Sequence, residues 1–273
     1  MSEGHHKQSF WSKYIWSTDH KIIGIQYGIT SLIWLLFGFA LMAIMRYQLA
    51  YPGSPVPIVG SLLGEGGILP SEMYNSLGAM HGTIMIFLGV VPLAFGAFGN
   101  YLVPLQIGAI DMAFPKLNAA SYWTYFLGSV IMVTGFFVPG GAANSGWTSY
   151  PPLANTATMG QTVWLLGMIM LITSSLLGSV NILEFARTQK NLERFVYFST
   201  DEIFGNAPKD VSYKEYDRYN STNPYSATKA GGEELAVAFE NSYHMPIYIT
   251  HTMNVFGERQ HPEKYIPMTI RNV

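Results

Sequence analysis

The sequence predicts a mainly α-helical membrane protein, with a transmembrane bundle of four spans followed by a partial α/β segment. Four apolar runs, near residues 22–45, 76–103, 121–138 and 161–185, approach the twenty residues that about 30 Å of hydrocarbon requires. Charged side chains are unevenly spread, with 11 Asp, Glu, Lys and Arg in residues 1–185 and 21 in residues 186–273. This rise in charge density indicates a lipid-embedded part, assigned to residues 1–181, and a solvated part, assigned to residues 182–273.

Composition narrows the possible partners and cofactors. A net charge of -2 argues against nucleic acid as the main partner. The absence of Cys excludes disulfides, thiolate metal sites and covalent haem attachment through C-x-x-C-H, so any haem needs other ligands. The N-terminus stays polar for too long before the first apolar run to read as a cleavable signal peptide.

The loops carry a charge asymmetry that predicts orientation. Arg46 is the only Lys or Arg on one side, at a membrane edge, whereas the other side has Lys7, Lys13, Lys21, Lys116, Arg187, Lys190 and Arg194. Because cytoplasmic loops are enriched in Lys and Arg, both termini are expected in the cytoplasm. The loops at 47–75 and 139–160 are then expected to face outward.

His81 lies inside the second apolar run, in the stretch SLGAMHGTIMIF. An imidazole in hydrocarbon needs a partner, and a neutral ring nitrogen is a good axial ligand for haem iron. A histidine hydrogen-bonded to a neighbouring helix is an equally good interpretation from chemistry alone. Gly82 beside it would leave room for the face of a porphyrin.

Six stretches of the first two thirds are STDHKIIGIQY (17–27), RYQLAYPG (46–53), MHGTIMIF (80–87), FGNYLVPLQIGAIDMAFPKLNAASYW (98–123), GWTSYPPLA (146–154) and SSLLGSVN (174–181). In their order and spacing they resemble cytochrome c oxidase subunit I, the haem-copper oxidase subunit. The resemblance covers residues 10–181 and implies the first four helices of that subunit. It also implies a bacterial-type inner membrane, other oxidase subunits and cytochrome c as partners, and a role in electron and proton transport in a respiratory chain.

The same resemblance implies roles for particular residues. His81 would be one axial ligand of the low-spin haem iron, and Arg46 would meet the formyl end of the haem. A proton pathway would begin at Asp111 and continue along Asn100, Asn118, Ser175 and Asn181. A carboxylate followed by amides and hydroxyls on adjacent spans can hold a file of waters. Taken without the family, Asp111 is more simply a loop residue or a helix N-cap.

The family's second axial histidine, its copper-binding histidines, its oxygen-site tyrosine and the acidic end of its proton pathway belong to later helices. No such helices follow in this sequence. We therefore expect copper ligands to be absent, and no oxygen reduction from this chain alone.

The last third has the pattern of a soluble α/β protein. Phe195–Phe198 is suited to a buried strand, NPYSATKAGGEELAVAFENSY has helical periodicity after an Asn-Pro entry, and PIYITHTMNVFG reads as another strand. Tyr225 and Lys229 are four residues apart on the helix, hence on one face. A lysine ammonium beside a phenol favours the phenolate, which would make Tyr225 a proton donor or acceptor near neutral pH.

Three stretches of this part, STDEIFG (199–205), NPYSATKA (223–230) and NVFGERQHPEKYIPMTI (254–270), resemble extended short-chain dehydrogenase/reductases, especially nucleotide-sugar 4,6-dehydratases. The resemblance implies part of a Rossmann-like fold that uses NAD. Thr200, Tyr225 and Lys229 would align the sugar hydroxyl, Asp201 and Glu202 would handle the elimination of water, and Asn254 would contact the substrate. No strand followed by G-x-G-x-x-G precedes these motifs, so the pyrophosphate of NAD has no predicted cradle.

The two resemblances meet without a linker. One family accounts for SSLLGSVN and the other for a helix like GTVNILEFAR, so the sequence predicts a chimera with its junction between Gly178 and Phe185. A membrane-anchored NAD-dependent nucleotide-sugar dehydratase or epimerase, a non-functional gene-fusion or assembly artefact, and a non-enzymatic membrane scaffold remain alternatives.

Overall fold

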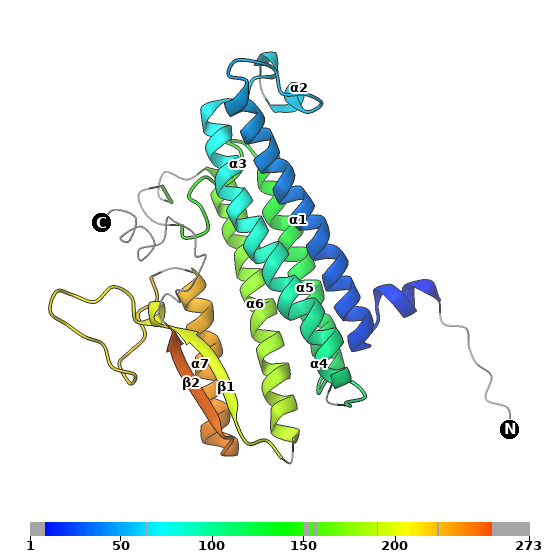
Figure 1. Ribbon diagram of the computed structural model, residues 1–273, viewed down its shortest axis with the longest axis vertical. Coiled ribbons are helices and arrows are strands. Elements are labelled where there is room, and N and C mark those ends of the chain that lie inside the picture. The colour runs from blue at the N-terminus through cyan, green and yellow to red at the C-terminus, as the bar shows by residue number, and fades with distance from the viewer. Residues whose placement is uncertain are drawn as a thin grey trace.

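The computed structural model describes residues 9–63, 65–106, 108–149, 153–154, 158–189, 191–222 and 224–252. Its main feature is an elongated bundle of antiparallel helices, against which a small α/β unit packs on one side (Figure 1). The bundle contains α1 (His20–Ala50), a long run of helix from α3 to α4 (Ser71–Gln106), α5 (Pro115–Thr134) and α6 (Met159–Thr188). A short helix, η1 (Trp11–Ile15), precedes the bundle, and α2 (Gly60–Leu63) and η2 (Glu65–Gly67) lie between α1 and α3.

The second helical run changes its winding along its length. It begins as α3 (Ser71–Thr83), continues as the π-helical segments η3 (Ile84–Val90) and η4 (Pro92–Gly99), and ends as α4 (Asn100–Gln106). Pro92 begins η4 and has no backbone N–H to donate to the preceding turn. The wider turns keep the run helical where Pro and Gly would break a helix in water.

Among the residues that the structure describes, three helices are long and apolar enough to cross a membrane. They are His20–Ala50, Ser71–Gln106 and Met159–Thr188, with mean hydropathies of 2.1, 1.9 and 2.0. They correspond to the predicted spans at 22–45, 76–103 and 161–185. The predicted span at 121–138 corresponds to α5 and the short helix η5 (Gly135–Phe137), but α5 is not among the three, so a fourth span stays a prediction.

Helices α5 and α6 approach each other closely in the bundle core. A Cβ added at Gly167 would lie 2.8 Å from the carbonyl oxygen of Gly128 and from the Cβ of Met132. Glycine is therefore required there for the two backbones to approach each other. Polar ties cross the same contact, because Ser121 and Ser174 each donate a hydrogen bond to the other's carbonyl oxygen, at 2.9 and 2.8 Å.

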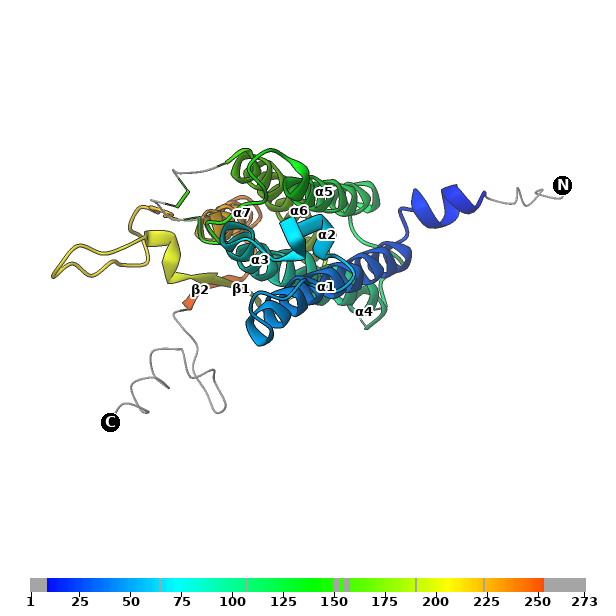
Figure 2. The same cartoon turned by 90° about the horizontal axis from the view of Figure 1, so that it is seen from above.

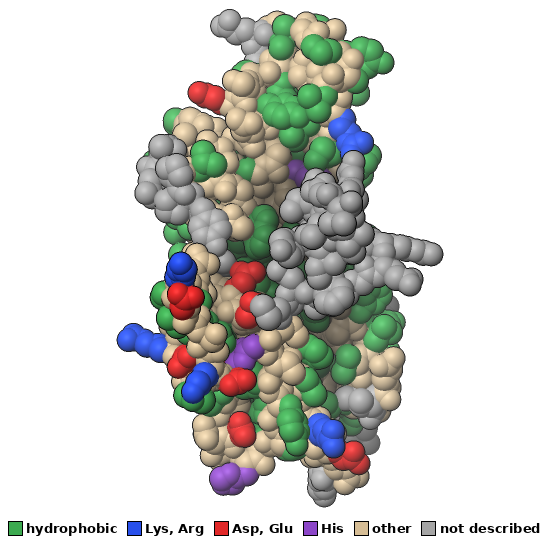
Figure 3. Space-filling view, turned by 60° about the vertical axis from the view of Figure 1, so that its left-hand side comes forward, with side chains coloured by type: hydrophobic (Ala, Val, Ile, Leu, Met, Phe, Trp, Pro, Cys, Tyr) green, Lys and Arg blue, Asp and Glu red, His purple; other side chains and the backbone are tan. Residues whose placement is uncertain are grey.

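The α/β unit follows α6. It consists of β1 (Phe195–Thr200), η6 (Asp201–Phe204), α7 (Pro224–Tyr243) and β2 (Ile247–Thr252). β1 and β2 pair in parallel, from Phe195 opposite Ile247 to Thr200 opposite Thr252. The predicted strand at 195–198, the predicted helix and the second predicted strand are all present. Charged side chains gather over this unit, while much of the upper bundle surface is apolar (Figure 3).

Helix α6 belongs to two hydrophobic cores. Its first half contributes Trp164, Met168 and Leu171 to the bundle core. Its last turns contribute Leu183 and Ala186 to the core of the α/β unit, which also contains Ala236, Met245 and Ile247. Seen from above, α7 lies beside the bundle with the sheet on its outer side (Figure 2). The helix runs unbroken through the predicted junction at Gly178 to Phe185.

Candidate functional site

His81 lies in α3 and contacts α1. Its Nδ1 is 2.8 Å from the carbonyl oxygen of Gly38. A carbonyl oxygen only accepts, so Nδ1 carries the proton and Nε2 keeps its lone pair. A Cβ added at neighbouring Gly82 would meet nothing within 4 Å. A ring held by a backbone carbonyl, with its other nitrogen available and open space beside it, is a good arrangement for an axial haem ligand. The hydrogen bond to the neighbouring helix is present, and it would also orient His81 as a ligand, a role that stays a prediction.

Arg46 is exposed on α1, eight residues after Gly38 and so about 12 Å along the helix axis. Its guanidinium is therefore available to a polar group of a cofactor bound near His81.

Three asparagines of the predicted proton pathway are buried with unpaired polar atoms. They are Asn100, Asn118 and Asn181, exposed by 8%, 3% and 0%. Oδ1 of Asn100 and Nδ2 of both Asn118 and Asn181 have no hydrogen-bond partner. Buried amides with an unpaired donor or acceptor are the kind of groups that bind internal water. Oδ1 of Asn181 accepts from the backbone N–H of Phe114 at 3.0 Å, which ties α6 to the loop before α5.

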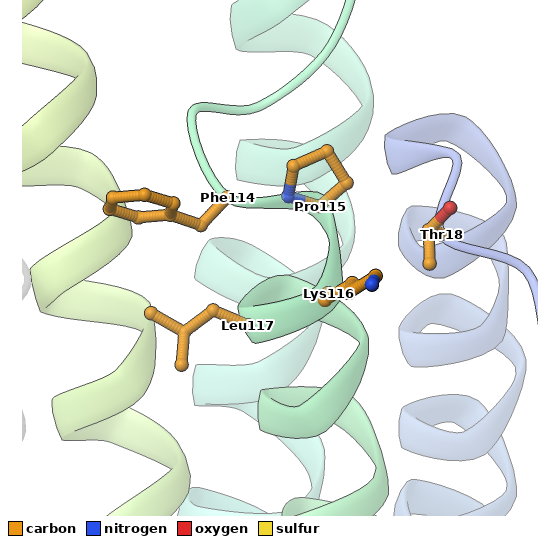
Figure 4. Close-up of a pocket in the computed structure, with 5 residues that line it drawn as sticks. All are labelled: Thr18, Phe114, Pro115, Lys116 and Leu117. Carbon is orange, nitrogen blue, oxygen red and sulfur yellow. The ribbon is translucent and has the colours of Figure 1, made fainter.

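Asp111 is half-buried in that same loop, and its Oδ1 accepts from the backbone N–H of Met112 at 2.8 Å. It is a loop residue, as one of the two sequence interpretations had it. A depression of about 720 Å³ opens nearby, lined by Thr18, Phe114, Pro115, Lys116 and Leu117 (Figure 4). The depression is mostly apolar and contains none of the predicted site residues.

Ser175 does not lie with the buried asparagines. Its side chain is exposed on α6, and the neighbouring Ser174 is the buried one. Ser121, bonded to Ser174, also hydrogen-bonds to the hydroxyl of Tyr27 at 3.0 Å. The periodicity of the helix explains the difference. Ser174 follows Leu171 by three residues and Gly167 by seven, so it lies on the same buried face of α6 as those two residues. That spacing was the signal from which Ser174 could have been chosen.

In the α/β unit, Thr200, Asp201 and Glu202 lie where β1 ends. Thr200 is buried, and its hydroxyl accepts from the backbone N–H of Glu202 at 3.3 Å, capping η6. Asp201 Oδ1 is 3.4 Å from the same hydroxyl. The cap holds both carboxylates at the end of the strand, close enough for their charges to act on Tyr225.

Tyr225 and Lys229 share a helix but do not form the predicted pair. Lys229 donates its ammonium to the carbonyl oxygen of Phe198 at 2.8 Å. The Tyr225 ring instead lies 6.3 Å from the ring of Trp147. Burial, followed by the charges of Glu202 and Asp201, raises the pKa of Tyr225, and burial lowers the pKa of Lys229. Burial and the two carboxylates disfavour a phenolate at Tyr225 in this arrangement, and the role of Tyr225 as a proton donor or acceptor stays a prediction.

A buried cluster around Glu233 was missed by the sequence analysis. Glu233 is 1% exposed, and its Oε1 accepts from the Tyr219 hydroxyl at 2.6 Å and lies 2.7 Å from Nε2 of His251. His251 also packs edge-on against Phe204, with ring centroids 5.0 Å apart. The cluster joins the loop before α7 to both α7 and β2. The sequence did contain a signal for this cluster, because Glu233 lies four residues after Lys229, on the buried face of α7.

The described residues do not fit the pyrophosphate of NAD. The described parts of the glycine-rich stretches, residues 65–70 and 139–146, lie between α1 and α3 and between α5 and α6. Neither stands between a strand and a helix N-terminus, where a dinucleotide is normally cradled. Asn254 and the HPEKYIP stretch lie outside the described residues.

Comparison with known proteins identifies the larger part of the chain. The family model of "Cytochrome C and Quinol oxidase polypeptide I" matches residues 22–199, more than half of the chain. The chain belongs to this family. Cytochrome c oxidase subunit 1 of Thermostichus vulcanus is 45% identical over 181 residues, covering 66% of this chain and 30% of the relative. The subunit of Synechocystis sp. is 43% identical over 178 residues, covering 64% and 30%. This oxidase-family chain thus spans about 30% of the length of these relatives.

A second family model, "NAD dependent epimerase/dehydratase family", matches residues 160–273. The oxidase-family chain is therefore a chimera, as the sequence predicted. The two matches overlap at residues 160–199, which contain nearly all of α6 and of β1.

Two solved structures are similar to the chimera in part. dTDP-glucose 4,6-dehydratase from Bacillus anthracis, in complex with NAD, is 31% identical with a TM-score of 0.34, covering 38% of this chain and 33% of that one. UDP-glucuronic acid 4-epimerase from Bacillus cereus is 26% identical with a TM-score of 0.31, covering 48% and 37%.

Proposed function

We propose that residues 1–181 form the part of a haem-copper oxidase subunit I that contributes one axial haem ligand and the entrance of a proton pathway. The observation that carries the proposal is His81, whose Nδ1 bonds to Gly38 while the space beside Gly82 is open. A haem would supply reversible one-electron chemistry there, and Arg46 would donate a hydrogen bond to the formyl group at its edge. Cytochrome c and the other oxidase subunits are the proposed partners. The proposed cellular location is a bacterial-type inner membrane.

The proposed topology has four spans with both termini in the cytoplasm. It rests on the three apolar helices, on α5 lying among them, and on the Lys and Arg distribution between the loops. The asparagines with unpaired polar atoms support a file of waters that starts near Asp111. If so, proteoliposomes should leak protons more slowly when Asp111 is replaced by Asn, as followed with an entrapped pH dye.

Haem titration followed by absorbance tests the first proposal. The full chain in detergent should bind haem weakly as a five-coordinate species, because His81 is the one axial ligand proposed for these residues. His81→Ala should abolish the absorbance change, and His244→Ala, at an exposed position after α7, should not. Equal binding by the chain and by His81→Ala would refute ligation by His81. Oxygen uptake with reduced cytochrome c is expected to be absent.

For residues 182–273 we propose a remnant of a nucleotide-sugar dehydratase that no longer binds NAD tightly. The support is the absence of a glycine cradle among the described residues, together with the diversion of Lys229 to Phe198. Calorimetric titration with NAD should give no binding at micromolar concentrations. Tight binding would favour the alternative of a membrane-anchored dehydratase or epimerase.

A further inference from the structure

Trp147 and Tyr225 touch although α6 lies between them in the chain. Trp147 precedes α6 and Tyr225 follows it, yet their ring centroids are 6.3 Å apart. If α6 spans a bilayer, the segments before and after it lie on opposite sides of about 30 Å of hydrocarbon. Trp147 also lies 6.1 Å from Phe87, near the middle of the apolar run Ser71–Gln106, so with both helices inserted the contact would hold Tyr225 at the depth of the hydrocarbon.

The packing of α7 along α6 explains how the contact arises. A Cβ added at Gly231 would lie 3.4 Å from Cδ2 of Leu176, and the guanidinium of Arg187 lies 4.8 Å from the Tyr243 ring. Gly231 to Tyr243 is twelve residues and Leu176 to Arg187 is eleven, so the two helices run parallel and in step. Figure 1 shows α7 rising beside α6 from its lower end toward the middle of the bundle.

This alignment of α7 with α6 determines how deep the charged groups of the α/β unit would lie in a bilayer that α6 spans. Lys229, two residues before Gly231, lies level with Ser174, and Tyr225, close to Asp201 and Glu202, lies higher still. Keeping Lys229 out of hydrocarbon leaves only residues 159–173 of α6 for the bilayer, a length of about 22 Å. About 30 Å is required, and burying charges in hydrocarbon costs several kcal/mol. Tilting α6 would shorten its reach further.

We propose that insertion of α6 into a bilayer of ordinary thickness and docking of α7 on α6 are mutually exclusive states of this chain. The inference rests on the proposed membrane span of α6. The face of α6 that includes Leu176 is covered by lipid in one state and by α7 in the other. Residues 195–252 then detach from α6 when the helix is fully inserted.

Double-cysteine cross-linking tests the proposal, and the chain has no native Cys to interfere. The reporter is Leu176→Cys with Gly231→Cys, and a cysteine fits at Gly231 because its Cβ makes ordinary contacts. The positive control is Ser121→Cys with Ser174→Cys, whose hydroxyls are 3.2 Å apart within the bundle. The negative control is Leu165→Cys with Gly231→Cys, in which position 165 lies about 16 Å further along α6.

The full chain is reconstituted in phosphatidylcholine vesicles of decreasing acyl-chain length. The reporter should lose its cross-link, down to the negative control, in bilayers of about 30 Å, and regain it as the hydrocarbon approaches about 22 Å. The positive control should cross-link at every thickness. Labelling of the single variant Gly231→Cys by a membrane-impermeant maleimide should change in the opposite sense to the reporter.

Two results would overturn the inference while leaving the membrane span intact. One is a reporter yield as high as the positive control at all thicknesses, and the other is a yield at background even in the thinnest bilayers. A separate measurement tests the span itself. If alkaline treatment extracted the chain from the vesicles, the proposed span would be wrong, and the inference would fail with it.

Discussion

Lys229 donates its ammonium to the carbonyl oxygen of Phe198 at 2.8 Å, so this lysine ties α7 to β1. The ammonium of Lys229 therefore does not stabilise a phenolate at Tyr225. The pKa of Tyr225 is instead raised by burial and by the charges of Glu202 and Asp201. In this structure Lys229 therefore contributes to the packing of α7 against β1.

The first prediction concerns the pKa of Tyr225. Because the Glu202 charge disfavours the phenolate, Glu202→Gln should lower this pKa toward the ordinary value for tyrosine. Nuclear magnetic resonance titration of labelled tyrosine rings, assigned with Tyr225→Phe, measures the shift. Glu240→Gln, at an exposed position on α7, is the matched control and should leave the titration unchanged. A rise in the Tyr225 pKa in the Glu202 variant would contradict the electrostatic argument.

A second prediction concerns alkaline pH. Burial raises the pKa of Tyr197 to about 12 and also raises the pKa values of Tyr219 and Tyr225 above 10.0. A raised folded-state pKa contributes stability that is fully present below the unfolded value and is lost as pH rises above it. Urea unfolding followed by circular dichroism should show the α/β unit weaker at pH 11 than at pH 8. Tyr197→Phe should reduce this loss, and an undiminished loss would exclude Tyr197 as a contributor.

The third prediction compares two adjacent glutamates of α7. Glu233→Ala removes a buried acceptor bonded to Tyr219 and His251 and should lower the free energy of unfolding by about 2–4 kcal/mol. Glu234→Ala, at an exposed position, should change it by less than about 0.5 kcal/mol. Pulse proteolysis in urea, scored by cleavage within residues 195–252, measures both. Similar values for the two variants would mean that the buried cluster does not stabilise the unit.

A fourth prediction concerns the contact of α5 with α6. Gly167→Ala places a Cβ 2.8 Å from the Gly128 carbonyl oxygen and should cost about 1–3 kcal/mol. Gly99→Ala, where a Cβ meets nothing within 4 Å, should be neutral or stabilising. Thermal unfolding in detergent gives the comparison. If the Gly99 variant unfolded at a lower temperature than the Gly167 variant, glycine at position 167 would not be needed for the close approach of α5 and α6.

Much of this architecture was predictable because its signals are local. Apolar length predicted the helices of the bundle, and short β-branched and aromatic runs predicted β1 and β2. Motif order predicted the two families and the chimera. Helix phase would also have separated buried Ser174 from exposed Ser175, although the resemblance pointed to the latter.

The contacts that the sequence did not predict depend on distant partners. The Tyr225 pKa is raised by burial and then by carboxylates more than twenty residues away, whereas the i,i+4 spacing with Lys229 takes account only of α7. The Glu233 cluster joins three segments that have no common sequence pattern. The docking of α7 on α6 likewise joins segments that are far apart in the sequence, such as Leu176 and Gly231.

The sharing of α6 between two cores also sets an order of events during synthesis. The ribosome completes α6 at Thr188, and α7 ends 55 residues later at Tyr243. At about 5–20 residues per second, α6 is available to the translocon and to lipid for several seconds before α7 exists. The face of α6 that includes Leu176 therefore contacts lipid before α7 is synthesised.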